Sequence, residues 1–125
     1  MLKKKSKRQK LGSKISKVCD KKIRLNGISA AERGHSSYVY CKELVRAIIK
    51  KSTSVNCKLT GEKTYDRFVG ICHINIGDSS KNLQEIIVGN HCARDCEQYS
   101  NGRYKIYETI ESKKLPLPNY CKKKN

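Results

Sequence analysis

Residues 23–34 read I-R-L-N-G-I-S-A-A-E-R-G and set one arginine and one glutamate close to the end of a single predicted strand. The first four letters alternate apolar and polar, which predicts an extended segment over residues 23–28 with one buried face. Glu32 follows Arg24 by eight residues across a loop of small residues, so the chain is long enough to bring the carboxylate back to the guanidinium. Such a pair suits phosphodiester hydrolysis, in which arginine holds the phosphate and the acid activates water. A structural ion pair is the alternative interpretation.

Further motifs follow this stretch along the chain. They are T-Y-D-R-F-V-G-I-C at 64–72, L-Q-E-I-I-V-G-N-H-C-A-R-D-C at 83–96, Y-S-N-G-R-Y at 99–104 and L-P-L-P-N-Y-C at 115–121. Together with I-R-L-N-G-I-S-A-A-E they resemble, in order, the staphylococcal nuclease-like (thermonuclease) family, in a bacterial branch that carries A-R-D-C and R-Y-S-G-G-R-Y. The resemblance covers residues 12–121 as one domain. It implies an α+β, mainly β fold, a small five-stranded OB-type barrel with about three helices.

The resemblance assigns roles to individual residues. Arg24 falls on the first catalytic arginine of the family and Glu32 on its catalytic glutamate. The second arginine of the family aligns with Val69, so we expect Arg67, two residues earlier on the same strand face, to replace it. Pairing of Arg67 with Asp66 or another acid is the structural alternative. The remaining expected substrate contacts are Arg33, His35 and Tyr65.

The family binds calcium through two aspartates, and both positions differ here. The first falls on Ser13 and the second on Ser29. Calcium selects oxygen donors that bring negative charge, and two neutral hydroxyls do not replace two carboxylates. We therefore expect the calcium site to be lost or much weakened, with Asp20 and Asp66 as the remaining acidic candidates.

Charge and length restrict the partners. The chain has 125 residues, one domain in size, and 28 Lys and Arg against 11 Asp and Glu give a formal charge of +17. We expect sequence-nonspecific binding of DNA or RNA by a monomer, with an anionic membrane surface as the second candidate. A basic arm over residues 1–11 and a basic tail over 122–125 flank the domain. The sequence contains no apolar run that would span a bilayer.

Periodicity predicts the remaining elements. A strand over residues 12–18 would pair with 23–28, and Arg103 would open a last helix with Tyr104, Tyr107 and Ile110 on its inner face. His91 stands where the family has glycine, so we interpret it as a helix-cap residue. The other expected elements are helices over 37–49 and 82–88, and a hairpin of strands 55–59 and 65–76 with a turn at 60–63.

Seven cysteines are more than a reduced cytosolic protein usually carries. Two disulfides are one hypothesis, Cys57 with Cys72 across the hairpin and Cys96 with Cys121 near the end of the chain, while Cys41 would be a free core residue. The alternative is a zinc site built from His91, Cys92 and Cys96 with His73 or Cys121. The basic start is not followed by an apolar segment, so the chain as written predicts a cytoplasmic protein, whereas the cysteines suggest exported or periplasmic ancestry.

Overall fold

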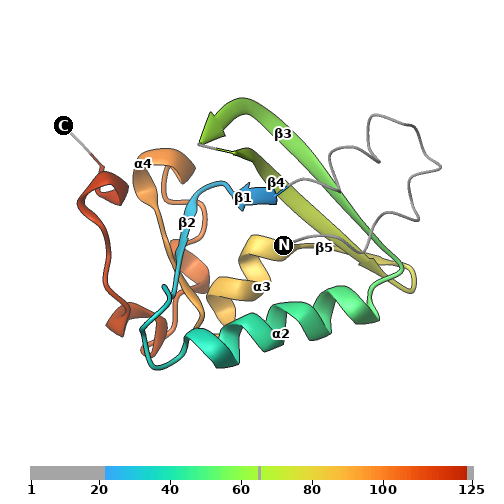
Figure 1. Ribbon diagram of the computed structural model, residues 1–125, viewed down its shortest axis with the longest axis horizontal. Coiled ribbons are helices and arrows are strands. Elements are labelled where there is room, and N and C mark those ends of the chain that lie inside the picture. The colour runs from blue at the N-terminus through green and yellow to red at the C-terminus, as the bar shows by residue number, and fades with distance from the viewer. Residues whose placement is uncertain (1–21, 65, 124–125) are drawn as a thin grey trace. The chain divides into compact units, whose positions relative to one another are not determined.

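The computed structural model describes residues 22–64 and 66–123, and these residues form a mixed α+β fold (Figure 1). Contacts divide the chain into two compact units. The first comprises Met1–Leu25 and Ala47–Asn82, and the second comprises Asn26–Arg46 and Leu83–Asn125. The longest helix, α2 (Tyr38–Lys51), contributes residues to both. It confirms the helix expected over residues 37–49.

The first unit contains a four-stranded sheet built around β4 (Arg67–Ile76). Strand β1 (Lys22–Leu25) pairs with β4 in parallel, whereas β3 (Ser54–Thr64) and β5 (Ser79–Asn82) pair with it antiparallel. The expected hairpin of β3 and β4 is therefore confirmed, but its turn is not at residues 60–63. Gly61, at φ +98°, lies within a register shift between Leu59 and Lys63, after which pairing resumes. The glycine in T-G-E-K thus marks a bulge in a longer strand.

One face of this sheet is buried. Val55 and Ile74 lie opposite each other on β3 and β4, and both are almost completely inaccessible to solvent. Cys57 and Cys72 are the next pair on the same face and form a disulfide with a Cα–Cα distance of 4.0 Å. Because side chains alternate along a strand, the residues between them point to the opposite face.

The second unit is organised around a two-stranded antiparallel sheet and a short helix. Strand β2 (Ile28–Ala30) pairs with β6 (Ala93–Asp95), and α3 (Leu83–Gly89) packs against both. Helix α4 (Glu97–Ser100) follows, and the chain then makes three 3₁₀ turns, Lys105–Tyr107, Ser112–Lys114 and Asn119–Cys121. The expected helix at 82–88 is confirmed as α3, whereas α4 and the strands β5 and β6 were not predicted.

The turn that follows β1 is fixed by Gly27. This glycine has φ +83°, and a Cβ added to it would lie 3.0 Å from the Cβ of Ser100 and 3.1 Å from a ring carbon of Tyr104. The Gln84 amide donates a hydrogen bond to the Asn26 carbonyl at 3.0 Å, and the Cys96 N–H donates to the Gly27 carbonyl at 2.8 Å. Only glycine fits a left-handed position that other atoms approach so closely.

The C-terminal end of α3 explains His91. The His91 and Cys92 N–H groups donate to the carbonyls of Val88 and Ile87 at 3.2 and 3.1 Å, and His91 has φ 69°. This is the Schellman motif, in which a left-handed residue ends the helix and the last carbonyls of the helix accept hydrogen bonds from the residues that follow. The interpretation of His91 as a cap residue is confirmed.

The prediction of a last helix over residues 103–112 is wrong. Asn101 and Gly102 are both left-handed, and after one 3₁₀ turn Glu108 is extended. The helix does not form because Glu108 turns its carboxylate back to accept a hydrogen bond from the Asp95 N–H at 2.8 Å. Tyr104 is buried as expected, but Tyr107 is exposed and Ile110 is 79% exposed.

The described strands form two separate sheets, and these are not closed into the single barrel that the resemblance implies. Parallel pairing of β1 with β4 and antiparallel pairing of β2 with β6 belong to different sheets because the Gly27 turn separates β1 from β2. The strand expected over residues 12–18 lies outside the described residues. The fold is therefore α+β with about six strands.

Candidate functional site

The two arginines expected in catalysis lie on neighbouring strands of one sheet. Arg24 is on β1 and Arg67 is on β4, and both are half-buried. Arg24 pairs with Val69, and Lys22 pairs with Arg67. Paired residues and residues two apart share a face of the sheet, so all four side chains belong to the face opposite the Cys57–Cys72 disulfide.

The register shows how far Arg67 is displaced. Val69, the position where the resemblance led us to expect a second arginine, is directly beside Arg24 and is 5% exposed. Arg67 is one pair earlier on the same face, so its Cα lies about 8 Å from that of Arg24, given about 6.6 Å along the strand and 4.8 Å across. Two long side chains that start at this separation can reach one phosphate group.

Asp66 forms its ion pair with Lys22. Its carboxylate contacts the Lys22 ammonium group at 3.6 Å, and both side chains are largely exposed. The structural alternative in which Asp66 pairs with Arg67 is therefore wrong. A surface ion pair such as that of Lys22 and Asp66 contributes little to stability.

Glu32, Arg33 and His35 belong to the second unit, in the loop between β2 and α2. Glu32 and Arg33 are exposed, and the Glu32 carbonyl accepts a hydrogen bond from the His35 N–H at 2.9 Å. The Nδ1 atom of His35 accepts the Ser37 N–H at 3.1 Å and lies 2.9 Å from the Ser37 hydroxyl. An acceptor at Nδ1 places the ring proton of neutral His35 on Nε2. His35 thus fixes the start of α2, and this contact was not predicted.

Three expected site residues lie outside the described part of the chain. They are Ser13, Asp20 and Tyr65.

The position where the resemblance implies the second calcium-binding aspartate lies beside a cation. Ser29 on β2 is buried and pairs directly with Arg94 on β6, so their side chains lie on the same face. The Arg94 Nε lies 3.6 Å from Glu108, and its Nη1 donates to the Leu115 carbonyl at 3.4 Å. A neutral hydroxyl beside a guanidinium does not fit Ca²⁺, which requires several oxygen donors with negative charge. Among the described residues no group of three or more His, Cys, Asp or Glu is placed to hold a metal ion.

The cysteines form disulfides, and the zinc hypothesis is wrong for the residues named in it. Cys57–Cys72 and Cys96–Cys121 are the two expected pairs, with S–S distances of 2.03 and 2.00 Å. Cys41 is not free but is bonded to Cys92. His91, far from ligating a metal with these sulfurs, has its Nδ1 2.7 Å from the Thr109 hydroxyl. Three disulfides are typical of a protein that matures in an oxidising compartment.

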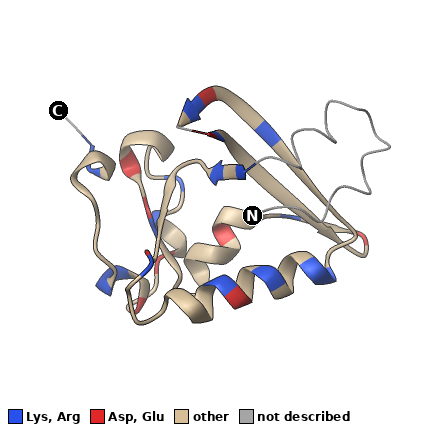
Figure 2. Cartoon of the chain, viewed as in Figure 1, with Lys and Arg blue, Asp and Glu red and all other residues tan. Residues whose placement is uncertain are grey.

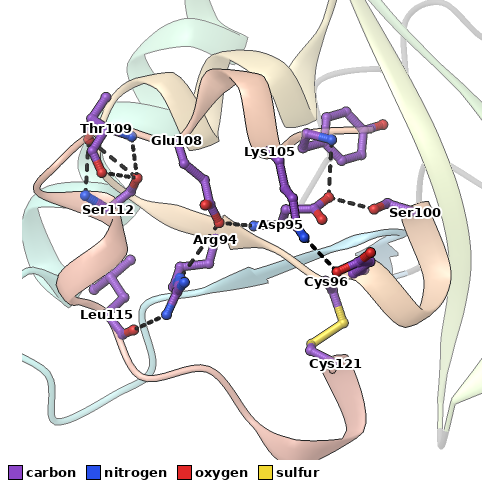
Figure 3. Close-up of polar contacts among 12 residues, drawn as sticks. Arg94, Asp95, Cys96, Ser100, Lys105, Glu108, Thr109, Ser112, Leu115 and Cys121 are labelled. Carbon is purple, nitrogen blue, oxygen red and sulfur yellow. Dashed lines mark hydrogen bonds and ion pairs between the residues drawn. A yellow bond between two sulfur atoms is a disulfide. The ribbon is translucent and has the colours of Figure 1, made fainter. Parts of the chain in front are cut away.

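The A-R-D-C and Y-S-N-G-R-Y motifs meet around Asp95 (Figure 3). The buried Asp95 carboxylate accepts hydrogen bonds from the Ser100 hydroxyl and, at 3.0 Å, from the Tyr104 N–H. Ser100 in turn accepts the Gly102 N–H at 2.9 Å. These hydrogen bonds join the two motifs within the second unit, and this role of Asp95 was not predicted from the sequence.

Charge is distributed over both units (Figure 2). Lysine and arginine recur on the exposed side of α2 and on β1, β3 and the C-terminal segment, with far fewer acids between them. None of the helices in the described part of the chain has the length and apolar character needed to cross a membrane.

Comparison of the chain with protein-family models, with curated proteins and with solved structures gives no significant match.

Proposed function

We propose that the protein is a nuclease-like phosphodiesterase that hydrolyses the backbone of DNA or RNA without reading its sequence. One observation carries the proposal. Arg24 and Arg67 lie on the same face of two hydrogen-bonded strands, one residue pair apart, in a chain of net charge +17. An OB-type barrel, which would require a strand outside the described residues, belongs to the same proposal.

The chemistry follows from the residue types. The guanidinium groups of Arg24 and Arg67 bind the non-bridging oxygens of one phosphate, which fixes it and withdraws charge from phosphorus. Glu32 accepts a proton from water as the water oxygen attacks phosphorus. The bond to the leaving oxygen breaks, and that oxygen takes up a proton from solvent water. The two arginines stabilise the negative charge that develops on the phosphoryl oxygens.

Calcium has no part in this mechanism as we propose it. Ser29 faces Arg94, and this donor set does not fit the ion. A metal requirement, if the assay reveals one, would have to come from an ion that the nucleic acid itself brings.

The binding step is electrostatic. Each phosphate neutralised by lysine or arginine releases counterions, so affinity falls steeply with salt. For single strands we expect the logarithm of the binding constant to fall linearly with the logarithm of the salt concentration, with a slope of about −0.7 per phosphate contacted. We also propose that the protein works in an exported or periplasmic setting, where its three disulfides persist.

The second candidate is a nucleic-acid-binding protein without catalysis. The pairing of Ser29 with Arg94 favours it, because the position where the resemblance implies a calcium-binding aspartate holds a neutral serine beside a cation. Such a binder would keep the basic surface but would need no carboxylate near the phosphate.

Cleavage of labelled single-stranded DNA and RNA distinguishes the two, in calcium, in magnesium and in chelator. For the enzyme we expect Glu32→Gln to lower the rate by about 10²- to 10⁴-fold and Arg67→Ala by about 10³-fold. Glu43→Gln is the matched control, because Glu43 is an exposed acid in the same unit, paired with Arg46 on α2. If the unaltered chain binds nucleic acid on filters but cleaves it under none of these conditions, the nuclease proposal is wrong and the binding protein without catalysis is supported.

A further inference from the structure

Two exposed tyrosines lie in the second unit, one in α4 and one in the last 3₁₀ turn. Tyr99 is in α4 and is 50% exposed, and Tyr120 is in the last 3₁₀ turn and is 46% exposed. Neither the proposed cleavage by Arg24, Arg67 and Glu32 nor the hydrogen bonds to Asp95 involve these rings. About half of the surface of each residue is therefore exposed to solvent, although tyrosine is a large side chain with an apolar ring.

A disulfide joins the two segments that carry the tyrosines. Cys96 immediately precedes α4 and Cys121 immediately follows Tyr120, and the Cys96–Cys121 bond holds their Cα atoms 4.4 Å apart (Figure 3). Tyr99 is one helical turn from Cys96, so the Cα atoms of the two tyrosines are at most about 13 Å apart. Helix α4 and the last 3₁₀ turn are also in contact with each other. The disulfide therefore keeps the two tyrosines near each other in the fold.

Two lysines adjoin the pair at the end of the chain. Lys122 and Lys123 are exposed and follow Tyr120 directly. Lys105 donates a hydrogen bond to Glu97 of α4 at 2.6 Å, so these two charges compensate each other. The bond from Lys105 lowers the pKa of Glu97, and the charge of Lys123 contributes to the same shift, which places Lys123 within electrostatic reach of α4. The surplus charge beside the rings is thus positive.

We propose that Tyr99 and Tyr120 form a stacking surface for unpaired bases of a single-stranded nucleic acid, with Lys122 and Lys123 binding the flanking phosphates. Every base has a π face, so stacking on tyrosine is tolerant of sequence and complements a cationic surface. A duplex offers no free base faces along its length, so this surface favours single strands. The inference rests on the proposed function only in its choice of nucleic acid as the ligand.

The chain has no tryptophan, which allows a direct optical test. In separate variants, Tyr99→Trp and Tyr120→Trp place a single reporter in the surface, and Tyr40→Trp places one on α2, where Tyr40 is 58% exposed in the same unit. Short oligothymidylate is titrated into each variant in a Glu32→Gln background, so that cleavage does not interfere. We expect quenching at positions 99 and 120 that saturates with binding, and little change at position 40.

Alanine variants test the energetic role. We expect Tyr99→Ala and Tyr120→Ala each to weaken binding of oligothymidylate by about 5- to 100-fold, since stacking contributes roughly this much per base. Tyr99→Phe should bind oligothymidylate with the affinity of the unaltered chain. An abasic oligomer of the same charge should bind Tyr99→Ala and the unaltered chain with equal affinity. Equal losses for Tyr40→Ala, or equal losses on the abasic oligomer, would overturn the proposal.

Failure of this inference differs from failure of the proposed function. If cleavage depends on Glu32 but no quenching occurs at positions 99 and 120, the stacking proposal is wrong and the nuclease proposal stands. Quenching without cleavage by the unaltered chain removes the nuclease and leaves the stacking surface.

Discussion

Gly27→Ala should destabilise the protein more than any other exchange of glycine for alanine at a left-handed position. Gly27 has φ +83°, and its added Cβ would meet Ser100 at 3.0 Å and Tyr104 at 3.1 Å. Neither neighbour moves easily, because Ser100 donates to the buried Asp95 and Tyr104 is 1% exposed. A left-handed alanine costs about 1–2 kcal/mol, and overpacking of a filled site costs roughly 1–3 kcal/mol more.

Gly102→Ala is the matched control. Gly102 has the same φ, +83°, but its added Cβ would meet only the end of the Lys105 side chain at 4.0 Å. It should therefore cost only the backbone term of about 1–2 kcal/mol. The difference between the two variants isolates the contact with Ser100 and Tyr104.

Urea unfolding, followed by far-ultraviolet circular dichroism with the disulfides intact, measures this difference. With an m-value of about 2 kcal/mol per molar urea, the difference of about 1–3 kcal/mol places the midpoint of Gly27→Ala roughly 0.5–1.5 M below that of Gly102→Ala. Equal midpoints would refute the claim that the Y-S-N-G-R-Y motif packs on the turn after β1.

Three further predictions concern the second unit and the disulfides. Replacing each disulfide by a serine pair should cost about 4.1 kcal/mol for Cys41–Cys92, 3.5 for Cys96–Cys121 and 3.0 for Cys57–Cys72, because the loops close over 51, 25 and 15 residues. Calorimetry that finds the reverse order would contradict this reasoning. Asp95→Asn should cost roughly 2–4 kcal/mol because two hydrogen bonds lose a charged acceptor, whereas the exposed Asp78→Asn should cost almost nothing in the same urea assay. The hydrogen bond from Lys105 lowers the pKa of Glu97, so its stabilisation is present above the unfolded pKa and is lost as pH falls through the folded one. Carboxyl NMR titration should find the Glu97 midpoint below 4.5, and Lys105→Gln should raise it; an unchanged midpoint would show that the contact is absent.

The parts of the fold that the sequence predicted are those with strong local signals. Helix α2 has a clear apolar stripe, and the β3–β4 hairpin has alternation on both strands. His91 was interpreted as a cap residue because the resemblance places it where the family has glycine, and the structure gives it φ 69°. In each case the deciding interactions lie within a few residues of one another.

The errors share a physical cause, which is a long-range contact that overrides local periodicity. Residues 103–112 have a helical pattern, but the Glu108 carboxylate is recruited by the backbone of Asp95, and the chain there is extended. Cys41 fits the apolar stripe of α2, and nothing near it in the sequence indicates a bond to Cys92, which is 51 residues away. Gly61 suggested a turn where the strand instead bulges and continues.

The candidate site shows the same division. Residues two apart on a strand share a face, which predicted that Arg67 lies on the same face as position 69. That this face is also that of Arg24 depends on the pairing of β1 with β4, just as the pairing of Ser29 with Arg94 depends on which strands meet. The structural role of the A-R-D-C motif is likewise visible only when Ser100 and Tyr104 are seen to donate to Asp95.

The central claim is that Arg24 and Arg67 hold one scissile phosphate, and single-turnover cleavage by the two single variants and the double variant tests it most directly. Two groups that act as a unit on one phosphate have strongly non-additive effects. We predict that Arg24→Ala and Arg67→Ala each slow cleavage by about 10³-fold and that the double variant is scarcely slower than either. Cleavage that survives Arg67→Ala at the original rate, or losses that simply multiply in the double variant, would contradict the account.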